Sequence, residues 1–195
     1  MKELVFATNN RNKLKEADQI LDDRVVLLNL DDIGCHEEIE ESEKTIEGNA
    51  LLKAKYVHQN YKMDAFADDT GLEVYALDME PGVFSARYAG EPSNAENNIR
   101  LLLSRMQGIK ERKARFRTVI ALILQGKEHL FEGIIDGRIA EEVSGNSGFG
   151  YDPIFIPENS QKSFAEMSSL EKNSISHRGI ALRKMADFLE TQKLI

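Results

Sequence analysis

The chain has 195 residues, of which 42% are hydrophobic and 30% charged, and its formal net charge at pH 7 is -8. This composition is typical of one soluble globular domain, and it excludes a nonspecific nucleic-acid binder because no basic surplus exists to release counterions. The single cysteine, Cys35, excludes an intrachain disulfide and a CxxC metal site. No stretch approaches the ~18 apolar residues of a membrane span, and no signal-like cleavage site is present, so we expect a cytoplasmic protein that binds neither nucleic acid nor membranes.

The first third of the chain alternates short apolar runs with helical patterns. Residues 4–7 and 25–30 predict strands, and apolar side chains at three- and four-residue spacing predict helices over 14–21 and 45–61. The loop 8–13 joins the first strand to the first helix, and a helix start of this kind favours anions. A plain capping loop is the alternative for that segment.

An acidic stretch and a carboxylate pair come next. Residues 37–47 contain six glutamates, which a solvated loop explains, although one or two of them could help to hold a metal. Residues 65–67 predict a buried strand that Asp68 and Asp69 end, and Gly71 allows a sharp turn there. Burying adjacent carboxylates is costly unless a cation or a proton is held with them, so a solvated turn is the alternative.

The second half mixes hairpins with helices. The expected strands lie at 72–77, 114–124, 129–135, 138–143 and 154–157, with a turn at 136–137. A capping box at 93–96 predicts a helix start, and a last helix begins at His177. The pattern predicts one α/β domain around a mixed sheet.

Two further segments carry candidate chemistry. The glycine-rich stretch 144–153 holds Phe149 and Tyr151 on a thin loop, and an aromatic ring held in this way can stack on a base, a contact worth ~1–3 kcal/mol. A hairpin with its aromatic rings in the core is the alternative. His177 and Arg178 stand at a helix start, where the helix dipole disfavours cations, and such local conflicts are typical of functional sites. A surface helix start without a role is the alternative for this pair.

In this order, the segments resemble the inosine triphosphate pyrophosphatase family, which acts on non-standard purine nucleoside triphosphates. The similarity runs along essentially the whole chain. Its motifs are ATNNRNK at 7–13 with Glu16, EGNA at 47–50 with Lys53 and Ala54, ADDTGL at 67–72, PGVFSARYAG at 81–90, GFGYDP at 148–153 and SHRG at 176–179. The resemblance implies a single ITPase-like domain over 1–195, with a long mixed sheet flanked by helices and an active-site cleft between two lobes.

The resemblance also implies the reaction. ITP, dITP and XTP would be hydrolysed to the monophosphate and pyrophosphate, which keeps them out of DNA and RNA, by a homodimer that requires Mg²⁺. Asp69 would be the general base and, together with Glu40, a ligand of the metal. Glu41 is the adjacent alternative to Glu40, and Asp68 is an outer partner.

The substrate-binding residues that the resemblance implies come from five segments. They are Thr8, Asn9, Asn10, Arg11, Asn12, Lys13, Lys53, Thr70, Phe149, Gly150, Tyr151, Asp152, Lys172, His177 and Arg178. The loop 8–13, with Lys53 and Lys172, would bind the triphosphate. Phe149 would stack on the base, and the pair His177 and Arg178 would donate to its 6-keto oxygen. Adenine would leave those donors unpaired and would be rejected.

Two other functions compete with this interpretation. One is a Maf-type pyrophosphatase for pyrimidine or modified nucleotides, and the presence of Phe149 with the His177 and Arg178 pair weighs against it. The other is a nucleotide sensor without turnover. The pair Asp68 and Asp69 weighs against a sensor, because binding alone needs no activation of water.

Overall fold

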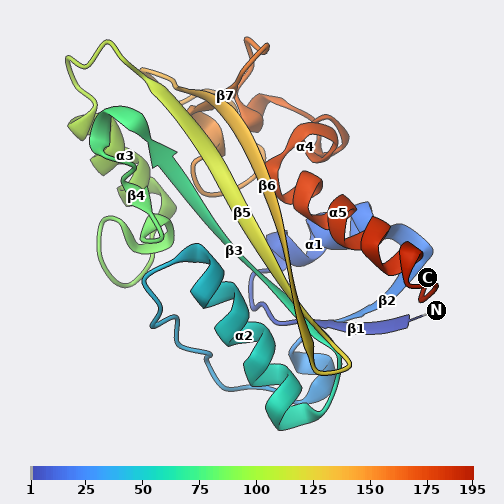
Figure 1. The fold of residues 1–195 in the computed structure, drawn as a ribbon. Helices are drawn as coiled ribbons and strands as arrows, with labels where there is room; N and C mark the ends of the chain where they lie inside the picture. The colour runs from blue at the N-terminus through green and yellow to red at the C-terminus, as the bar shows by residue number, and fades with distance from the viewer. Residues whose placement is uncertain (1) are drawn as a thin grey trace. The chain divides into compact units, whose positions relative to one another are not determined.

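The computed structural model describes residues 2–195, which form seven strands and five α-helices (Figure 1). The strands are β1 (Lys2–Phe6), β2 (Val25–Leu28), β3 (Ala65–Val74), β4 (Pro81–Gly82), β5 (Lys113–Leu124), β6 (Lys127–Ile139) and β7 (Phe155–Pro157). The helices are α1 (Arg11–Leu21), α2 (Ile46–Tyr61), α3 (Ala95–Arg105), α4 (Ser169–Ile175) and α5 (His177–Thr191).

All seven strands belong to one mixed sheet with the order β2-β1-β3-β5-β6-β7, and β4 pairs with β3 outside this path. Strand β1 runs parallel to both β2 and β3, as expected where helices connect the strands. Strands β4 and β7 run antiparallel to β3 and β6, respectively. The predicted α/β class with a mixed sheet is therefore confirmed.

The chain divides into two compact units. The first unit comprises the chain up to Asp69 with residues 118–133 and 178–195, and the second comprises 70–117 and 134–177. Strands β3, β5 and β6 each contribute residues to both units.

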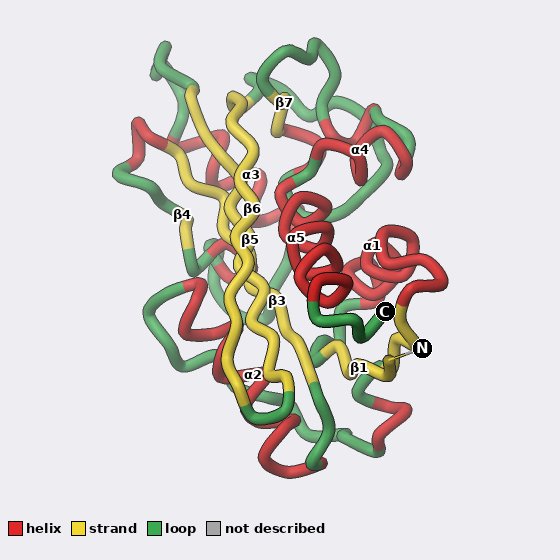
Figure 2. The backbone as a smooth tube through the Cα atoms, turned by 45° about the vertical axis from the view of Figure 1, so that its right-hand side comes forward, coloured by secondary structure: helices red, strands yellow, loops and turns green. Residues whose placement is uncertain are grey.

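In the first unit, α1 and α5 cover one face of the sheet and α2 covers the other (Figure 1). Alternation along the strands produces this arrangement, because successive side chains point to opposite faces. Leu4 and Phe6 pack with α1 and α5, whereas Val5 and Ala7 pack with α2. The rings of Phe6 and Phe66 stack with centroids 4.5 Å apart, and Figure 2 shows α1 and α5 side by side.

The second unit has its own core, in which α3 packs against the end of β3. Leu102 of α3 and Leu72 of β3 are fully buried in it. Three aromatic rings extend this core: Phe116 lies with its centroid 4.6 Å from that of Phe155, which lies 5.2 Å from that of Phe164. Aromatic contacts at these distances add to the energy of burial.

Strand β3 corrects the prediction of a strand end at the carboxylate pair. It continues through Asp68 and Asp69 to Val74, and a short 3-10 turn then occupies 75–77, where a strand was expected. Both carboxylates lie inside the sheet and are buried. Turn propensity at these residues is overridden because partners elsewhere in the chain compensate their charge.

Strand β6 corrects a second predicted turn, at Asp136 and Gly137. The strand is continuous from Lys127 to Ile139, and Gly137 pairs with Pro157 of β7. A Cβ atom at Gly137 would lie 2.4 Å from the carbonyl oxygen of Ile156. The glycine therefore permits close approach of two strands rather than a turn.

The helix starts agree with the sequence only in part. Helix α1 begins at Arg11, inside the predicted loop 8–13, and α4 was not predicted. Thr45 is the N-cap of α2. Helix α3 begins where it was expected, but its cap is Asn94, whose side chain accepts from the Asn97 N–H at 2.9 Å. Ser93, the expected cap, instead donates its hydroxyl to the carbonyl of Ala86.

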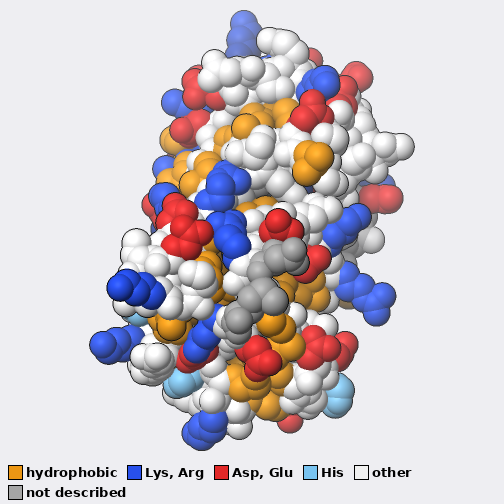
Figure 3. Space-filling model, turned by 90° about the vertical axis from the view of Figure 1, so that its right-hand side faces the viewer, with side chains coloured by type: hydrophobic (Ala, Val, Ile, Leu, Met, Phe, Trp, Pro, Cys, Tyr) orange, Lys and Arg blue, Asp and Glu red, His pale blue; other side chains and the backbone are white. Residues whose placement is uncertain are grey.

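No helix within residues 2–195 is both long and apolar enough to cross a membrane. On the face drawn in Figure 3, Lys and Arg side chains lie among Asp and Glu side chains rather than in one basic surface.

Candidate active site

The carboxylate of Asp68 is buried in the first unit between two cations. Lys13 Nζ lies 2.9 Å from Oδ1, and Arg178 Nε lies 2.9 Å from Oδ2. Burial alone would raise the pKa of Asp68, but the charges of Lys13, Arg178 and Lys53 hold it well below its usual range. Asp68 is therefore the member of the pair that stays ionised at neutral pH.

Arg178 lies at the start of α5 and is only 2% exposed. Besides Asp68, its guanidinium contacts Glu16 of α1, with NH1 2.5 Å from Oε2. Burial would lower the pKa of Arg178, but Asp68 and Glu16 raise it further above its usual range. Glu16 was noted in the sequence only as a motif residue. Its ion pair with Arg178, which is far from it in the sequence, could not be predicted from the sequence pattern.

Asp69 follows Asp68 in β3, so its side chain points to the opposite face of the strand. It meets α2 there, and Asn49 Nδ2 donates to Asp69 Oδ2 at 3.3 Å. Burial raises the pKa of Asp69 to about 6, although the charge of Lys53 opposes this shift. Two neighbouring carboxylates thus have opposite pKa shifts.

Lys53 connects Asp69 to the acidic segment. Its Nζ donates to the carbonyl oxygen of Asp68 at 2.8 Å and lies 2.5 Å from Glu41 Oε1. Burial would lower the pKa of Lys53, but Asp69 and Glu41 raise it above its usual value. Glu41 is half-buried and its charge also acts on Asp69, whereas Glu40 is exposed. Which of the two glutamates serves a metal stays a prediction.

The loop 8–13 has the capping contacts of the alternative interpretation. Asn10 is the N-cap of α1, and its Oδ1 accepts from the N–H groups of Asn12 at 2.9 Å and Lys13 at 3.2 Å. Thr8 Oγ1 accepts from the Asn10 N–H at 3.2 Å. The exposed residues of the loop are Asn9, Asn10, Arg11 and Asn12. Their contact with a triphosphate stays a prediction.

In the second unit, Asp152 organises the glycine-rich loop. Its Oδ2 accepts from the Phe149 N–H at 2.9 Å and lies 2.6 Å from Lys172 Nζ. Lys172 is buried and its Nζ lies 4.7 Å from the centroid of the Phe149 ring, within reach of a cation–π contact. Gly148 has φ +75°, and a Cβ there would lie 2.1 Å from Asp152 Oδ2. The structure thus brings Lys172 to Phe149, and its predicted contact with the triphosphate is untested.

Tyr151 anchors the same loop through a buried side chain. It is buried, its hydroxyl donates to the carbonyl of Ser85 at 2.8 Å, and burial raises its pKa. Ser85 Oγ in turn accepts from the Leu72 N–H at 2.8 Å. Two more predicted residues of this unit, Thr70 and Gly150, are half-buried.

His177 and Arg178 have different surroundings despite their adjacency. His177 belongs to the second unit, where it is buried and stacks on Phe116 with centroids 4.5 Å apart. Arg178 belongs to the first unit, with Asp68 and Glu16. The role of both at a 6-keto oxygen stays a prediction.

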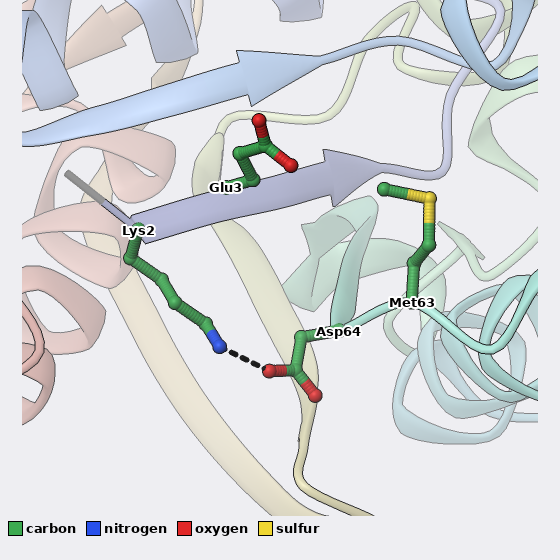
Figure 4. Close-up of a pocket in the computed structure, with 4 residues that line it drawn as sticks. All are labelled: Lys2, Glu3, Met63 and Asp64. Carbon is green, nitrogen blue, oxygen red and sulfur yellow. Dashed lines mark ion pairs between the residues drawn. The ribbon is translucent and has the colours of Figure 1, made fainter.

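A pocket in the first unit is separate from these residues. It is lined by Lys2, Glu3, Met63 and Asp64, and Lys2 Nζ pairs with Asp64 Oδ2 at 2.5 Å (Figure 4). It involves the start of β1, whereas the loop 8–13 follows the end of that strand. None of the predicted site residues lines it.

The donor set near Asp69 fits a hard cation. Within residues 2–195, no group of three or more His, Cys, Asp or Glu side chains is arranged to hold a metal. Mg²⁺ commonly takes only one or two carboxylates and completes its shell with waters and substrate phosphates. Asp69 with a neighbouring glutamate would suit an ion that arrives with a phosphate.

These features define an α/β domain with a buried site of carboxylates and lysines and, in its second unit, an aromatic loop rich in glycine. The chain belongs to the Ham1 family, whose model matches residues 4–188.

Named relatives match over nearly the whole chain. The dITP/XTP pyrophosphatase of Porphyromonas gingivalis is 56% identical over 190 residues, covering 97% of this chain and 98% of that protein. The dITP/XTP pyrophosphatase of Bacillus subtilis is 46% identical, with 97% and 98% covered. The solved Ham1 protein of Staphylococcus aureus is 37% identical with a TM-score of 0.89, covering 98% of this chain and 100% of that one. These matches confirm the family resemblance and the fold.

Amide substitution of the two carboxylates is expected to change stability in opposite directions. Asp68→Asn removes the counter-charge of the buried Lys13 and one of the two counter-charges of Arg178, and should lower the free energy of unfolding by about 3–5 kcal/mol at pH 8. Asp69→Asn removes a carboxylate whose ionised form the fold disfavours and should raise it by up to about 3 kcal/mol. Urea unfolding of protein freed of divalent metal measures both.

The dependence on pH provides the control. The pKa of Asp69 is raised to about 6 from 3.8, so the cost of ionising it is present above about pH 6 and disappears as the pH falls to about 4. The gain from Asp69→Asn should disappear over the same range. Asp68, whose pKa is lowered, contributes stability above its ordinary value of 3.8 and loses it only on further acidification. An Asp69→Asn variant that is less stable than wild type at pH 8 would contradict this account.

Proposed function

We propose that this chain is a nucleoside triphosphate pyrophosphatase that hydrolyses ITP, dITP and XTP to the monophosphate and pyrophosphate. The observation that carries the proposal is the pair of adjacent buried carboxylates, one held ionised by Lys13 and Arg178 and the other with its pKa raised to about 6. The substrate class is supported by the names of relatives such as the dITP/XTP pyrophosphatase of Porphyromonas gingivalis, 56% identical over 190 residues.

Asp69 is the general base in this proposal. Burial raises the pKa of Asp69 in the metal-free protein, but a cation beside the carboxylate would keep it ionised, so Asp69 acts more by orienting the attacking water than by strong basicity. Its carboxylate takes the proton of the attacking water as the water oxygen bonds to the α-phosphorus. The bond from the α-phosphorus to the oxygen that bridges it to the β-phosphorus then breaks and releases pyrophosphate. Phosphoryl transfer otherwise needs positioning and charge neutralisation, which Lys13 and Lys53 supply.

The metal in this proposal is Mg²⁺, held by Asp69 and Glu41. The ion would neutralise phosphate charge and polarise the attacking water. Glu41 is preferred to Glu40 because it is half-buried and its charge acts on Asp69. Lys53 of α2 pairs with Glu41 and so holds the Glu41 carboxylate close to that helix.

The base is bound in this proposal by Phe149, which stacks on the purine. Asp152 fixes the backbone of Phe149 through its N–H, and Lys172 lies against the ring, so the platform is held in place before the substrate arrives. We further propose that the enzyme is a homodimer that acts on the cytoplasmic nucleotide pool, as the family resemblance implies.

Substrate selection tests the proposal directly. Pyrophosphate release with Mg²⁺ should be faster for ITP and XTP than for ATP by about 100-fold or more in kcat/KM, because the 6-amino group of adenine leaves donors of the site unpaired. Slower release from GTP, which shares the 6-keto oxygen, and from dTTP is expected from the family resemblance alone. Asp69→Asn should lower kcat for ITP by about 10²–10⁴-fold. Preference for dTTP would establish the Maf-type alternative, and tight binding of ITP without turnover would establish a sensor.

The aromatic platform is tested by two substitutions at Phe149. Phe149→Leu should raise KM for ITP by about 10- to 100-fold, because a stacked base is worth ~1–3 kcal/mol, and should change kcat little. Phe149→Tyr keeps the ring and is the matched control, with KM within about threefold of wild type. Equal KM values for the two variants would remove Phe149 from the base site.

The assignment of the metal is tested by Glu41→Gln against Glu40→Gln. We expect Glu41→Gln to raise the Mg²⁺ concentration for half-maximal activity by about 10- to 100-fold, whereas the exposed Glu40 should tolerate the same change within about threefold. Titration of ITP hydrolysis with Mg²⁺ measures both. The larger effect in Glu40→Gln would instead make Glu40 the ligand.

A further inference from the structure

We propose that Asn49 is a positioning residue that holds the acidic segment 37–45 and the carboxylate of Asp69 in one arrangement. The proposal rests on the proposed function, in which Asp69 takes the proton of the attacking water. Asn49 contacts Asp69, and its part in the reaction is exerted through that carboxylate.

The side chain of Asn49 bridges two elements of the first unit. It is 0% exposed, and its Nδ2 donates to Asp69 Oδ2 at 3.3 Å while its Oδ1 accepts from the Glu43 N–H at 3.0 Å. A carboxamide has one donor end and one acceptor end, so only this orientation satisfies both partners. The reverse orientation would place a carbonyl oxygen against the carboxylate and an NH₂ group against the backbone N–H.

Close packing of the acidic segment on the start of α2 makes this bridge possible. A Cβ atom at Gly48 would lie 2.8 Å from Glu43 Cβ and 3.0 Å from Glu43 Cγ, so a glycine is needed where the segment crosses the helix. Thr45 Oγ1 accepts from the Gly48 N–H at 3.0 Å and fixes the end of the segment.

The other end of the acidic segment is also anchored. Glu37 Oε2 accepts from the hydroxyl of Tyr56 at 3.0 Å. Glu41 lies between this anchor and the Asn49 contact at Glu43, and it pairs with Lys53. The bridge therefore links the position of Asp69, the proposed general base, to that of Glu41, the proposed metal ligand.

Neither aspartate nor alanine would make both contacts from this position. Aspartate would keep the acceptor for Glu43 but would set a second carboxylate against Asp69, and alanine would lose both contacts. Loss of the bridge displaces a reacting group, and a displacement of about 1 Å can lower a rate by about 100-fold. The effect should fall on kcat rather than on KM, because other residues bind the triphosphate and the purine ring of the substrate.

The second unit offers a matched control in Asn98. It is the fourth residue of α3, as Asn49 is the fourth of α2, and it is 3% exposed. Its Oδ1 accepts from the Ala89 N–H at 2.7 Å, and its Nδ2 donates to the carbonyls of Ala86 at 2.9 Å and Ser85 at 3.4 Å. Burial and helix position are alike, and both side chains accept at Oδ1 and donate at Nδ2, but all three partners of Asn98 belong to the backbone.

The experiment compares Asn49→Ala with Asn98→Ala by ITP hydrolysis, thermal unfolding and hydrogen exchange of the Glu43 amide. Both variants should lose similar stability. Asn49→Ala should lower kcat by about 30- to 100-fold with KM within about threefold, and Glu43 exchange should become at least about tenfold faster. Asn98→Ala should keep kcat and Glu43 exchange within about threefold of wild type.

Asn49→Asp separates the two contacts and replaces Asn49→Ala if that variant does not fold. It should retain slow exchange at Glu43 while kcat falls as in Asn49→Ala. The proposal is overturned if a folded Asn49 variant keeps its kcat, or if the two alanine variants lose kcat in the same proportion. If wild type releases no pyrophosphate from ITP, the proposed function fails, whereas exchange at Glu43 still reports whether the bridge holds the acidic segment.

Discussion

The first unit depends on the burial of one ionised carboxylate, that of Asp68. An unpaired buried carboxylate would cost several kcal/mol, and here Lys13 and Arg178 each lie 2.9 Å from one of its oxygens. Glu16 lies on the far side of Arg178, so two anions face two cations. These groups come from α1, β3 and α5, and the requirement to pair them joins segments that are distant in the sequence.

The alternation of a strand gives the neighbouring carboxylates different roles. Asp68 points toward α1 and α5, where the charges of Lys13, Arg178 and Lys53 outweigh burial and lower its pKa. Asp69 points toward α2, where burial outweighs the charge of Lys53 and raises its pKa to about 6. Enzymes use such pairs to keep one carboxylate charged and another ready to exchange a proton. The adjacency that looks unfavourable in sequence is therefore a means of placing two unlike groups at one point of the sheet.

Local periodicity predicted most of the fold because it records which face of an element is buried. The apolar run at 4–7 and the helical spacing in 45–61 both correspond to elements of the first unit. The two turns expected around Asp69 and at Gly137 were wrong for one reason: turn propensity is a local property, whereas β3 and β6 are held by pairing and charge compensation from distant residues. Gly137 illustrates this point. A glycine is needed there because the carbonyl oxygen of Ile156 lies close to it, and a single sequence does not show that these two residues are neighbours.

The site was predictable in its residue types but not in its pairings. The family resemblance implies that His177 and Arg178 donate to one 6-keto oxygen, and this role stays a prediction. Their contacts within the protein differ, because successive helical residues point about 100° apart. One ring therefore enters the aromatic core of the second unit while the next guanidinium reaches Asp68 in the first. Adjacency in sequence places residues on one segment, and the turn of the helix decides which surroundings each one meets. The surroundings matter most for charged residues, because a buried cation is tolerated only where an anion from another element pairs with it.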